Sequence, residues 1–176
     1  MADPSILKLQ LVHASAVDVG RVAAVVNAAF AVYPFMGGDR TTAEEIAEEM
    51  GESGEFILAS EDGAIVGCAM IRPSLDVDWG VDSGAAINAA DAVYLGLVAV
   101  EPRIRKQGLG RRMITEAERI ARERGFARMV LGTVAEMGNV AYYEPMGYAV
   151  VDRTRFGAGH WEMTIDHEFC VMVKAL

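Results

Sequence analysis

The sequence predicts a mixed α/β fold of the α+β kind, in which helices cover both faces of a largely antiparallel sheet that contains one parallel pair of strands. Two apolar runs flank Asp-Gly at 62–63, a dipeptide typical of β-hairpin turns. An apolar run at 92–100, a helical pattern at 108–125 and another apolar run at 126–134 follow with short links. Such a strand–helix–strand unit places its strands parallel in a right-handed crossover. No repeat or Pro/Ser-rich linker divides the chain, so we expect one domain over 1–176.

The N-terminal segment is expected to form an edge strand followed by a helix. Residues 6–13 alternate weakly between apolar and polar side chains, as an edge strand does. Ser15 with Asp18 forms a capping-box-like start, and apolar residues then recur at helical spacing up to about Phe30.

A second helix and the hairpin come next. Thr41 with Glu44 begins a short, strongly acidic helix that ends near Gly51. The Asp-Gly pair at 62–63 supplies the positive φ angles that a type I′ turn requires. The stretch 73–91 is rich in Asp, Gly and Ala without usable periodicity, and we interpret it as a long mobile loop.

The C-terminal half contains a well-marked helix and three further elements. Gly125 stops the helix as a C-terminal glycine cap. A brief helix around 139–144, a strand from Tyr148 and a last strand over 169–174 complete the fold. The apolar stripe of the marked helix consists of Met113, Ile114, Ala117, Ile120 and Ala121.

Charge is distributed unevenly along the chain. The formal net charge is −9 and the pI is about 4.8, which disfavours a general nucleic-acid binder because phosphate contacts need a basic surface. Residues 101–128, however, hold nine Lys/Arg and four Asp/Glu, a local charge of +5, so the remainder carries −14. One basic segment inside an acidic protein is the first indication of function.

Other features of the composition restrict the class of protein. Cys68 and Cys170 fall in apolar runs, which is typical of buried reduced thiols rather than of a disulfide. The three histidines show no metal-ligand spacing, and the N-terminus lacks the plan of a signal peptide. The longest apolar run, 92–100, is about half of what a membrane span needs. We therefore expect a cytoplasmic protein without a metal site or membrane attachment.

The helix that begins near Gly108 lacks a normal N-terminal cap. A helix start exposes about four unpaired backbone N–H groups and about half a unit of positive charge. No Ser, Thr, Asp or Asn precedes this helix, and Arg111 and Arg112 add cations to its first turn. A bound anion would correct both faults, and Gly108 and Gly110 let the backbone approach it closely. The pattern favours a pyrophosphate.

Two common phosphate-binding motifs fit poorly, and a surface loop of solvated arginines stays open as an alternative. A Walker loop needs Lys and Ser/Thr after the glycines, where this chain has Arg111 and Arg112. A dinucleotide fingerprint needs a third glycine, where this chain has Met113, and an acidic residue about 20 residues further on.

Two segments resemble the GNAT superfamily of N-acetyltransferases. Residues 98–110 run from an apolar strand through a Pro into Arg-Lys-Gln-Gly-Leu-Gly, which is similar to that family's acetyl-CoA motif. Asn139 followed by Tyr-Glu-Pro-Met-Gly-Tyr at 143–148 is similar to its Asn…Tyr-x-x-x-Gly-Phe/Tyr segment. The resemblance covers about 56–148. It implies a sheet that splays open after the strand containing Val98 to admit CoA.

The resemblance also implies which residues hold acetyl-CoA. Its arm would add to the strand like a further strand, and a backbone N–H near Val98 would polarise the thioester carbonyl. The pyrophosphate would rest on the N–H groups of 107–110, with side-chain cations adding charge-assisted contacts unless they are merely solvated. The implied set is Val98, Ala99, Val100, Arg105, Lys106, Gln107, Gly108, Leu109, Gly110, Arg111, Asn139 and Tyr143.

Tyr143 matches the tyrosine that serves this family as general acid. A phenol stays protonated at neutral pH and can donate to a departing thiolate. Packing against the pantetheine arm is the alternative role. Tyr142 is expected to pack on the core, and Asn139 either bonds the CoA arm or caps the short helix. Pro145 must end that helix early.

The general base and the acceptor pocket are less defined. Many family members carry a Glu on the strand at 94–96, where this chain has no acid, so Asp91, Glu136 or a water molecule stay open as the base. We interpret the acids of the second helix as a solvated face: Glu44, Glu45, Glu48 and Glu49. By resemblance and position, the acceptor pocket is expected from 33–36, the 73–91 loop and His160-Trp161.

Together these observations predict an N-acetyltransferase that moves the acetyl group of acetyl-CoA to a primary amine, on a small molecule or a peptide, by direct attack without covalent intermediate or metal. The acidic body hints at cationic acceptors such as polyamines, aminoglycosides or lysine-bearing peptides. The alternative is a module of the same fold that binds an acyl-CoA as a sensor or partner without turnover. A homodimer stays open.

Overall fold

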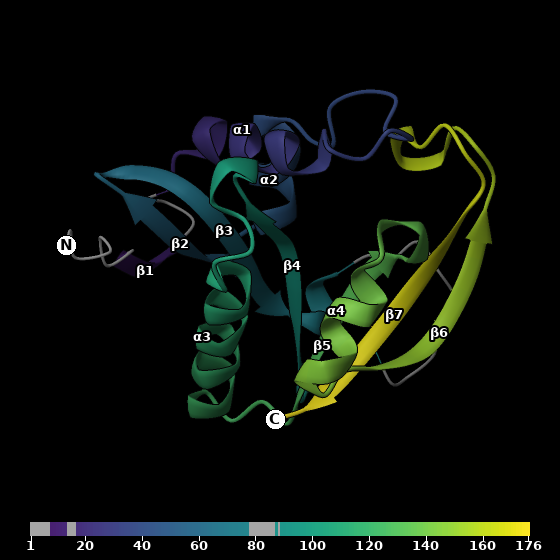
Figure 1. Ribbon diagram of the computed structural model, residues 1–176. Coiled ribbons are helices and arrows are strands. Elements are labelled where there is room, and N and C mark those ends of the chain that lie inside the picture. The colour runs from purple at the N-terminus through teal and green to yellow at the C-terminus, as the bar shows by residue number, and fades with distance from the viewer. Residues whose placement is uncertain (1–7, 14–16, 78–86, 88) are drawn as a thin grey trace.

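The computed structural model describes residues 8–13, 17–77, 87 and 89–176 (Figure 1). Its strands are β1 Lys8–His13, β2 Glu55–Glu61, β3 Ala64–Pro73, β4 Ala92–Val100, β5 Arg128–Val134, β6 Ala149–Phe156 and β7 His167–Ala175. Its α-helices are α1 Val19–Phe30, α2 Ala43–Met50, α3 Leu109–Glu123 and α4 Asn139–Tyr143.

The described strands form one sheet in the order β1-β2-β3-β4-β5-β7-β6. β4 and β5 run parallel, and every other neighbouring pair is antiparallel. β1 lies at one edge of the sheet, as its weak alternation predicts. The hairpin of β2 and β3 turns at Asp62 and Gly63, whose φ angles of 50° and 82° are those of a type I′ turn. The predicted fold class is confirmed.

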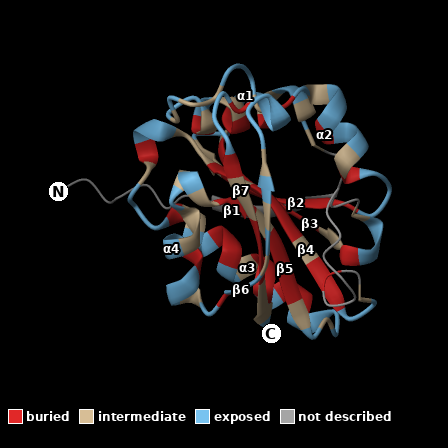
Figure 2. Ribbon diagram, turned by 90° about the vertical axis from the view of Figure 1, so that its right-hand side faces the viewer, coloured by how far each residue is buried: buried red, intermediate tan, exposed pale blue. Residues whose placement is uncertain are grey.

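Helices cover both faces of the sheet, with α1 and α2 on one side and α3 and α4 on the other (Figure 1). Figure 2 shows the buried residues concentrated along the strands and on the inward sides of the helices. The apolar side of α1 and α2 packs on one hydrophobic core with Phe56 and Met70, and α3 packs on another with Ile57 and Leu95. All five residues of the predicted α3 stripe are buried.

The sheet is splayed between β4 and β5. The two strands pair over three residues only, from Ala92 opposite Arg128 to Tyr94 opposite Val130. Beyond Tyr94, β4 has no partner on this side in the described part of the chain, whereas β5 pairs with β7 along its whole length. Figure 1 shows the two halves of the sheet meeting near the C-terminus and diverging away from it. The splay that the resemblance implied is therefore present.

The two ends of α3 differ in how they are capped. Gly108 precedes the helix with a φ of 77°, and no side chain of the described residues caps this end. At the other end Gly125 has a φ of 82°, and its N–H donates to the Arg122 carbonyl. The N–H of Phe126 donates to the carbonyl five residues earlier, which completes a Schellman motif. The uncapped start and the glycine stop were both predicted.

The start of α1 differs from the predicted capping box. Asp18 caps the helix, because its Oδ1 accepts the backbone N–H of Arg21 at 2.9 Å. Ser15, the other member of the predicted box, lies outside the described residues. So does most of the predicted 73–91 loop, of which a short 3₁₀ turn at Ser74–Asp76 is described.

The capping box of α2 lies one residue later than predicted. Thr42 Oγ1 accepts the N–H of Glu45 at 3.1 Å, and the Glu45 carboxylate accepts the N–H of Thr42 at 2.9 Å. The prediction of Thr41 with Glu44 was wrong because the Thr41 N–H already donates to the Asn27 side chain at 3.0 Å. The identity and length of the helix agree with the prediction.

Both cysteines are free and buried, as predicted. Burial raises the pKa of the Cys68 thiol to about 12, so this group remains a thiol at physiological pH.

Glu118 is a buried acid of α3 that joins this helix to the far half of the sheet. Its Oε2 accepts a hydrogen bond from Lys174 Nζ of β7 at 2.7 Å, and its Oε1 accepts the Tyr148 hydroxyl at 3.0 Å. The Glu118 side chain is 6% exposed and that of Lys174 19%. These contacts hold α3 against the strands on the other side of the splay.

Replacement of Glu118 by alanine is expected to lower the free energy of unfolding by about 3 kcal/mol, because it removes the carboxylate partner of Lys174 and leaves the buried Tyr148 hydroxyl with the weakly accepting Met129 sulfur. Urea denaturation of the purified variant measures this loss. Glu116 of the same helix is partly exposed and pairs with Arg119 on the helix surface, so Glu116→Ala is the control and should change stability by less than about 1 kcal/mol. Equal losses in the two variants would contradict the assignment.

Candidate active site

A β-bulge in β4 decides which side chains face the splay. Leu97 and Val98 both stand opposite Ala69 of β3, because the register shifts there by one residue. Leu97 has a φ of 48°, and its carbonyl accepts the Cys68 thiol at 3.3 Å. The extra residue reverses the alternation, so Leu97 stays in the α1/α2 core while Val98 packs against the α3/α4 core.

Two cavities open in the splay and share Phe30, Val98, Asn139 and Tyr143. The loop cavity, of about 410 Å³, lies between the end of β4, the loop that follows it and α4. The gap cavity, of about 520 Å³, lies between β4, β5 and α2. The loop cavity is lined by Ala29, Phe30, Tyr33, Val98, Ala99, Val100, Ile104, Arg105, Lys106, Gly108, Leu109, Gly110, Arg111, Asn139, Tyr142 and Tyr143. Of the twelve residues that the resemblance implied, only Gln107 is missing from this lining.

The start of α3 brings unpaired backbone N–H groups to the loop cavity. In the described part of the chain no acceptor pairs with the N–H groups of 107–111, and the first helical bond runs from the Arg112 N–H to the Gly108 carbonyl at 3.0 Å. Lys106 and Gly108 have φ angles of 64° and 77°. Left-handed residues at a helix start create a concave array of N–H groups that suits an anion. A Cβ built on Gly108 would meet no atom within 4 Å, so the approach is open.

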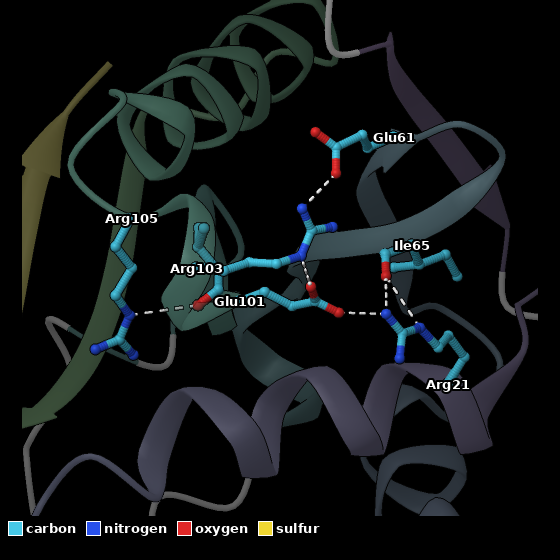
Figure 3. Close-up of polar contacts among 7 residues, drawn as sticks. Arg21, Glu61, Ile65, Glu101, Arg103 and Arg105 are labelled. Atoms are coloured by element: carbon cyan, nitrogen blue, oxygen red, sulfur yellow. Dashed lines mark hydrogen bonds and ion pairs between the residues drawn. The ribbon is translucent and has the colours of Figure 1, made fainter.

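Part of the basic segment holds the fold together (Figure 3). Arg103 forms ion pairs with Glu61 at 2.5 Å and with Glu101 at 2.9 Å. Arg21 of α1 pairs with the same Glu101 and donates to the Ile65 carbonyl at 2.7 and 3.0 Å. These charges connect α1, the β2–β3 hairpin and the loop after β4.

Arg105 is also engaged by the protein. Its guanidinium donates to the carbonyl of Val100 at 3.4 Å and to that of Ala29. A phosphate contact by Arg105 would therefore compete with two carbonyl acceptors. Lys106 and Arg111 are exposed and border the loop cavity, so they are the cations better placed for an anion there.

The two tyrosines of α4 occupy different environments. Tyr143 is 8% exposed, packs on Tyr148 with ring centroids 5.6 Å apart and borders both cavities. Tyr142 is 44% exposed, and its hydroxyl lies 3.0 Å from where a Cβ of Gly110 would stand. The prediction that Tyr142 packs on the core was wrong, because consecutive residues of a helix point in different directions. Burial raises the pKa of Tyr143, which keeps its hydroxyl protonated.

Asn139 is the first residue of α4 and lines both cavities. The capping position belongs to Gly138, and no side chain of the described residues caps this helix. The alternative that Asn139 caps the helix was therefore wrong. The helix ends at Tyr143 and continues as a 3₁₀ turn that contains Pro145, as predicted.

Two chain segments, the α1–α2 loop and the turn between β6 and β7, meet over the gap cavity and are called the roof. The Gly37 N–H donates to the Glu162 carbonyl at 2.7 Å, and the Thr164 N–H donates to the Phe35 carbonyl at 2.8 Å. In Figure 1 the α1–α2 loop crosses the open end of the splay to reach the β6–β7 turn. The roof thus joins the two halves of the sheet above the cavity.

The predicted acceptor segments only partly line this cavity. Met36, Val77 and Trp161 border it, whereas Tyr33 borders the loop cavity instead. His160 lines neither cavity and stacks on Phe156 with centroids 4.2 Å apart. Residues 78–86 and 88 of the expected loop lie outside the described part.

A carboxylate and a tyrosine of the gap cavity were missed by the sequence analysis. The Tyr94 hydroxyl donates to Glu49 Oε1 at 3.4 Å. Burial raises the pKa of Glu49, an effect that the charges of Arg40 and Arg72 oppose. The prediction that Glu49 belongs to a solvated face was wrong. The available signal was its place three residues after Ile46, which puts it beside the buried stripe of α2.

Gly96 makes room for the Tyr94 side chain. A Cβ at position 96 would lie 2.4 Å from the Tyr94 hydroxyl oxygen and 2.5 Å from two ring carbons. The ring therefore lies along β4 over Gly96. A side chain at position 96 would exclude this orientation.

The sequence suggested Asp91 and Glu136 as candidate bases, but both carboxylates contact groups outside the two cavities. Asp91 forms an ion pair with Arg128 at 2.6 Å, which lowers the pKa of its carboxyl. Glu136 accepts the backbone N–H of Glu168 at 3.0 and 3.2 Å. Neither residue lines the loop cavity or the gap cavity.

The described residues contain no group of three or more His, Cys, Asp or Glu side chains arranged to hold a metal ion. No helix among those the structure describes is long and apolar enough to cross a membrane.

Residues 22–148 match the family described as Acetyltransferase (GNAT) family. No curated protein matches the chain. Several solved structures have the same fold. The ribosomal-protein-S18-alanine N-acetyltransferase from Escherichia coli superposes with a TM-score of 0.71 at 18% identity, over 96% of this chain and 94% of that one.

Two further solved structures agree with this result. The ribosomal-protein-alanine N-acetyltransferase from Brucella melitensis has a TM-score of 0.68 at 18% identity, over 97% of this chain and 100% of its own. The IAA acetyltransferase from Bacillus cereus has a TM-score of 0.65 at 12% identity, over 97% and 99%. At such identities the likeness concerns the fold.

Replacement of Gly96 by alanine is expected to destabilise the protein by about 1–3 kcal/mol, because the new Cβ overlaps the Tyr94 ring. Thermal and urea denaturation measure the loss. The double variant Tyr94→Ala/Gly96→Ala supplies the control, since with the ring gone the second change should cost less than about 1 kcal/mol. Additive losses would show that Gly96 is needed for another reason.

Proposed function

The chain belongs to the GNAT family of acetyltransferases, and we propose that it transfers the acetyl group of acetyl-CoA to a primary amine by direct attack. The observation that carries this proposal is the meeting of two cavities at Val98, Asn139 and Tyr143. One cavity suits a phosphate-bearing thioester, and the other suits an acceptor that arrives from the opposite side. The transfer needs no covalent enzyme intermediate, because both substrates reach one point.

The loop cavity is the proposed site of acetyl-CoA. The uncapped N–H groups at 107–111 would bind the pyrophosphate, and Lys106 and Arg111 would add charge-assisted contacts. The unpaired side of β4 after Tyr94 would receive the arm of the substrate as an added strand, with a backbone N–H near Val98 toward the thioester carbonyl.

Tyr143 is the proposed general acid. It lies at the junction of the cavities, and its raised pKa keeps the hydroxyl protonated until sulfur departs. Asn139, on the same helix and bordering both cavities, is proposed to bond the arm of acetyl-CoA.

The gap cavity is the proposed acceptor site. Its walls combine apolar and aromatic side chains such as Met36, Trp161 and Phe169 with carboxylates of α2. Three glutamates face two arginines in the lining, which suits an acceptor with a cationic amine: Glu45, Glu48, Glu49, Arg40 and Arg72. Polyamines, aminoglycosides and lysine-bearing peptides are the acceptors to test first.

A module of this fold that binds an acyl-CoA without turnover is the second candidate function. Thiol release measured over a panel of primary amines separates the two, because a sensor binds acetyl-CoA and releases no CoA. Binding without release for every amine would favour the sensor.

Replacement of Gly108 by aspartate is expected to raise the Kd for acetyl-CoA by about 100-fold or more, because the carboxylate repels the pyrophosphate and occupies the free N–H groups. Isothermal calorimetry measures the Kd. Gly125→Asp is the matched control: Gly125 lies at the other end of the same helix with a φ of 82°, and no atom lies within 4 Å of its Cβ position. Unchanged affinity in Gly108→Asp would refute the phosphate site.

Replacement of Tyr143 by phenylalanine is expected to lower kcat by about 100-fold while the Kd for acetyl-CoA stays within about threefold, since only the proton donor is lost. Steady-state thiol release and calorimetry provide the two numbers. Tyr142→Phe, which removes a hydroxyl one residue away and on the loop-cavity side only, should retain kcat. A normal kcat in Tyr143→Phe would rule out its role as acid.

A further inference from the structure

The gap cavity holds one carboxylate whose surroundings differ from those of the other acids on its wall. Glu49 is half-buried at the end of α2, and the Tyr94 hydroxyl donates to it at 3.4 Å. Glu45 and Glu48 also border the cavity but are exposed, and the Glu45 carboxylate is used in the capping box of α2. Glu49 is therefore the acid of this wall that is both inside the cavity and held by a side chain from the sheet.

The position of the Tyr94 ring depends on a glycine two residues further along β4. With its hydroxyl 2.4 Å from where a Cβ of residue 96 would be, the ring can only lie along the strand because residue 96 is Gly. This orientation places the hydroxyl over Gly96, on the side of the sheet where Glu49 lies and within the lining of the gap cavity. The Tyr94–Glu49 pair therefore lines the same cavity as Val98 and Tyr143.

We propose that Glu49 is the general base of the acetyl transfer, and that Tyr94 is the positioning residue that holds its carboxylate toward the acceptor. This inference rests on the proposed function and names a group that it leaves open. Glu49 approaches from the α2 side of the splay, whereas Tyr143 lies on α4 across it. The base and the acid therefore face the reacting centre from opposite walls.

Each proton that moves during the acetyl transfer has a donor and an acceptor. An N–H bond of the acceptor ammonium breaks, and its proton passes to Glu49, which leaves a lone pair on nitrogen. Nitrogen forms a bond to the acetyl carbon as the C–S bond breaks, and the departing sulfur takes the proton of Tyr143. Nitrogen loses a second proton in forming the amide, and this proton restores Tyr143. Glu49 then releases its own proton to solvent, so that one proton is lost in each turnover.

The charged and hydrogen-bonding groups around Glu49 come from four elements. Arg40 of the α1–α2 loop, Arg72 of β3 and Tyr94 of β4 all lower its pKa, and Glu45 of its own helix raises it. Burial is the largest effect and raises the pKa above the usual value. A carboxylate whose pKa is raised in this way is a stronger base.

The pH profile of kcat/KM tests the proposal, with the best acceptor found in the amine panel. In the wild-type enzyme, kcat/KM falls on the acidic side as Glu49 becomes protonated. In Glu49→Gln, kcat/KM at pH 7 should fall by about 100-fold or more, and it should then rise with pH as the amine, of pKa about 10, loses its own proton. Near pH 10 the two enzymes should converge. Glu44→Gln is the matched control and keeps the wild-type profile, because Glu44 is an exposed acid of the same helix that lines neither cavity.

Tyr94→Phe gives a second and independent test of the proposed base, and this test applies even if the Glu49→Gln variant does not fold. It retains the ring over Gly96 and removes only the hydroxyl that lowers the pKa of Glu49. The acidic limb of the profile should therefore move to higher pH. A merely structural role would instead lower kcat/KM equally at every pH and leave the limb in place.

The outcomes separate this inference from the proposed function. If wild-type enzyme releases thiol while Glu49→Gln keeps both the acidic limb and a rate within about threefold of wild type at pH 7, Glu49 is not the base and the proposed function stands. An unmoved limb in Tyr94→Phe overturns the positioning role. If wild-type enzyme binds acetyl-CoA yet acts on no amine, the proposed function is overturned together with the inference.

Discussion

The early separation of β4 from β5 is the constraint on which the rest of the molecule depends. Parallel strands normally continue to pair, but here pairing ends at Tyr94 and β5 turns its other side to β7. The separation leaves one side of β4 without a strand partner in the described part of the chain, and both cavities open there. The Glu118–Lys174 contact and the roof hold the two halves at a defined distance. The site is therefore a consequence of how the sheet divides.

The bulge in β4 determines which side chains of this strand face each side of the splay. Because Leu97 and Val98 share one partner position, the strand alternation reverses just where the cavities meet. Before the bulge, Tyr94 faces the α1/α2 side, where Glu49 lies. After it, Val98 faces the α3/α4 side, where Tyr143 lies. β4 therefore contributes side chains to both walls of the splay.

Some cations of the basic segment at 101–128 stabilise the fold, and others are free to bind a ligand. Arg103 and Arg105 are used within the protein, by carboxylates and by backbone carbonyls respectively. The exposed cations Lys106 and Arg111 remain beside the uncapped start of α3. The local excess of positive charge that the composition revealed is therefore larger than the charge that is available to an anion.

The sequence by itself determined the features that depend on neighbours in the chain: the hairpin turn at 62–63, the apolar stripe of α3, its uncapped start at Gly108 and its glycine stop. Turn chemistry and helix caps act over a few residues, so a linear pattern contains them. Only the tertiary structure decided that Glu49 leaves the solvated face of α2 and meets Tyr94. That contact joins segments 45 residues apart and requires the absence of a Cβ on a third residue. No local pattern encodes such a contact, because it exists only once α2 packs on the sheet.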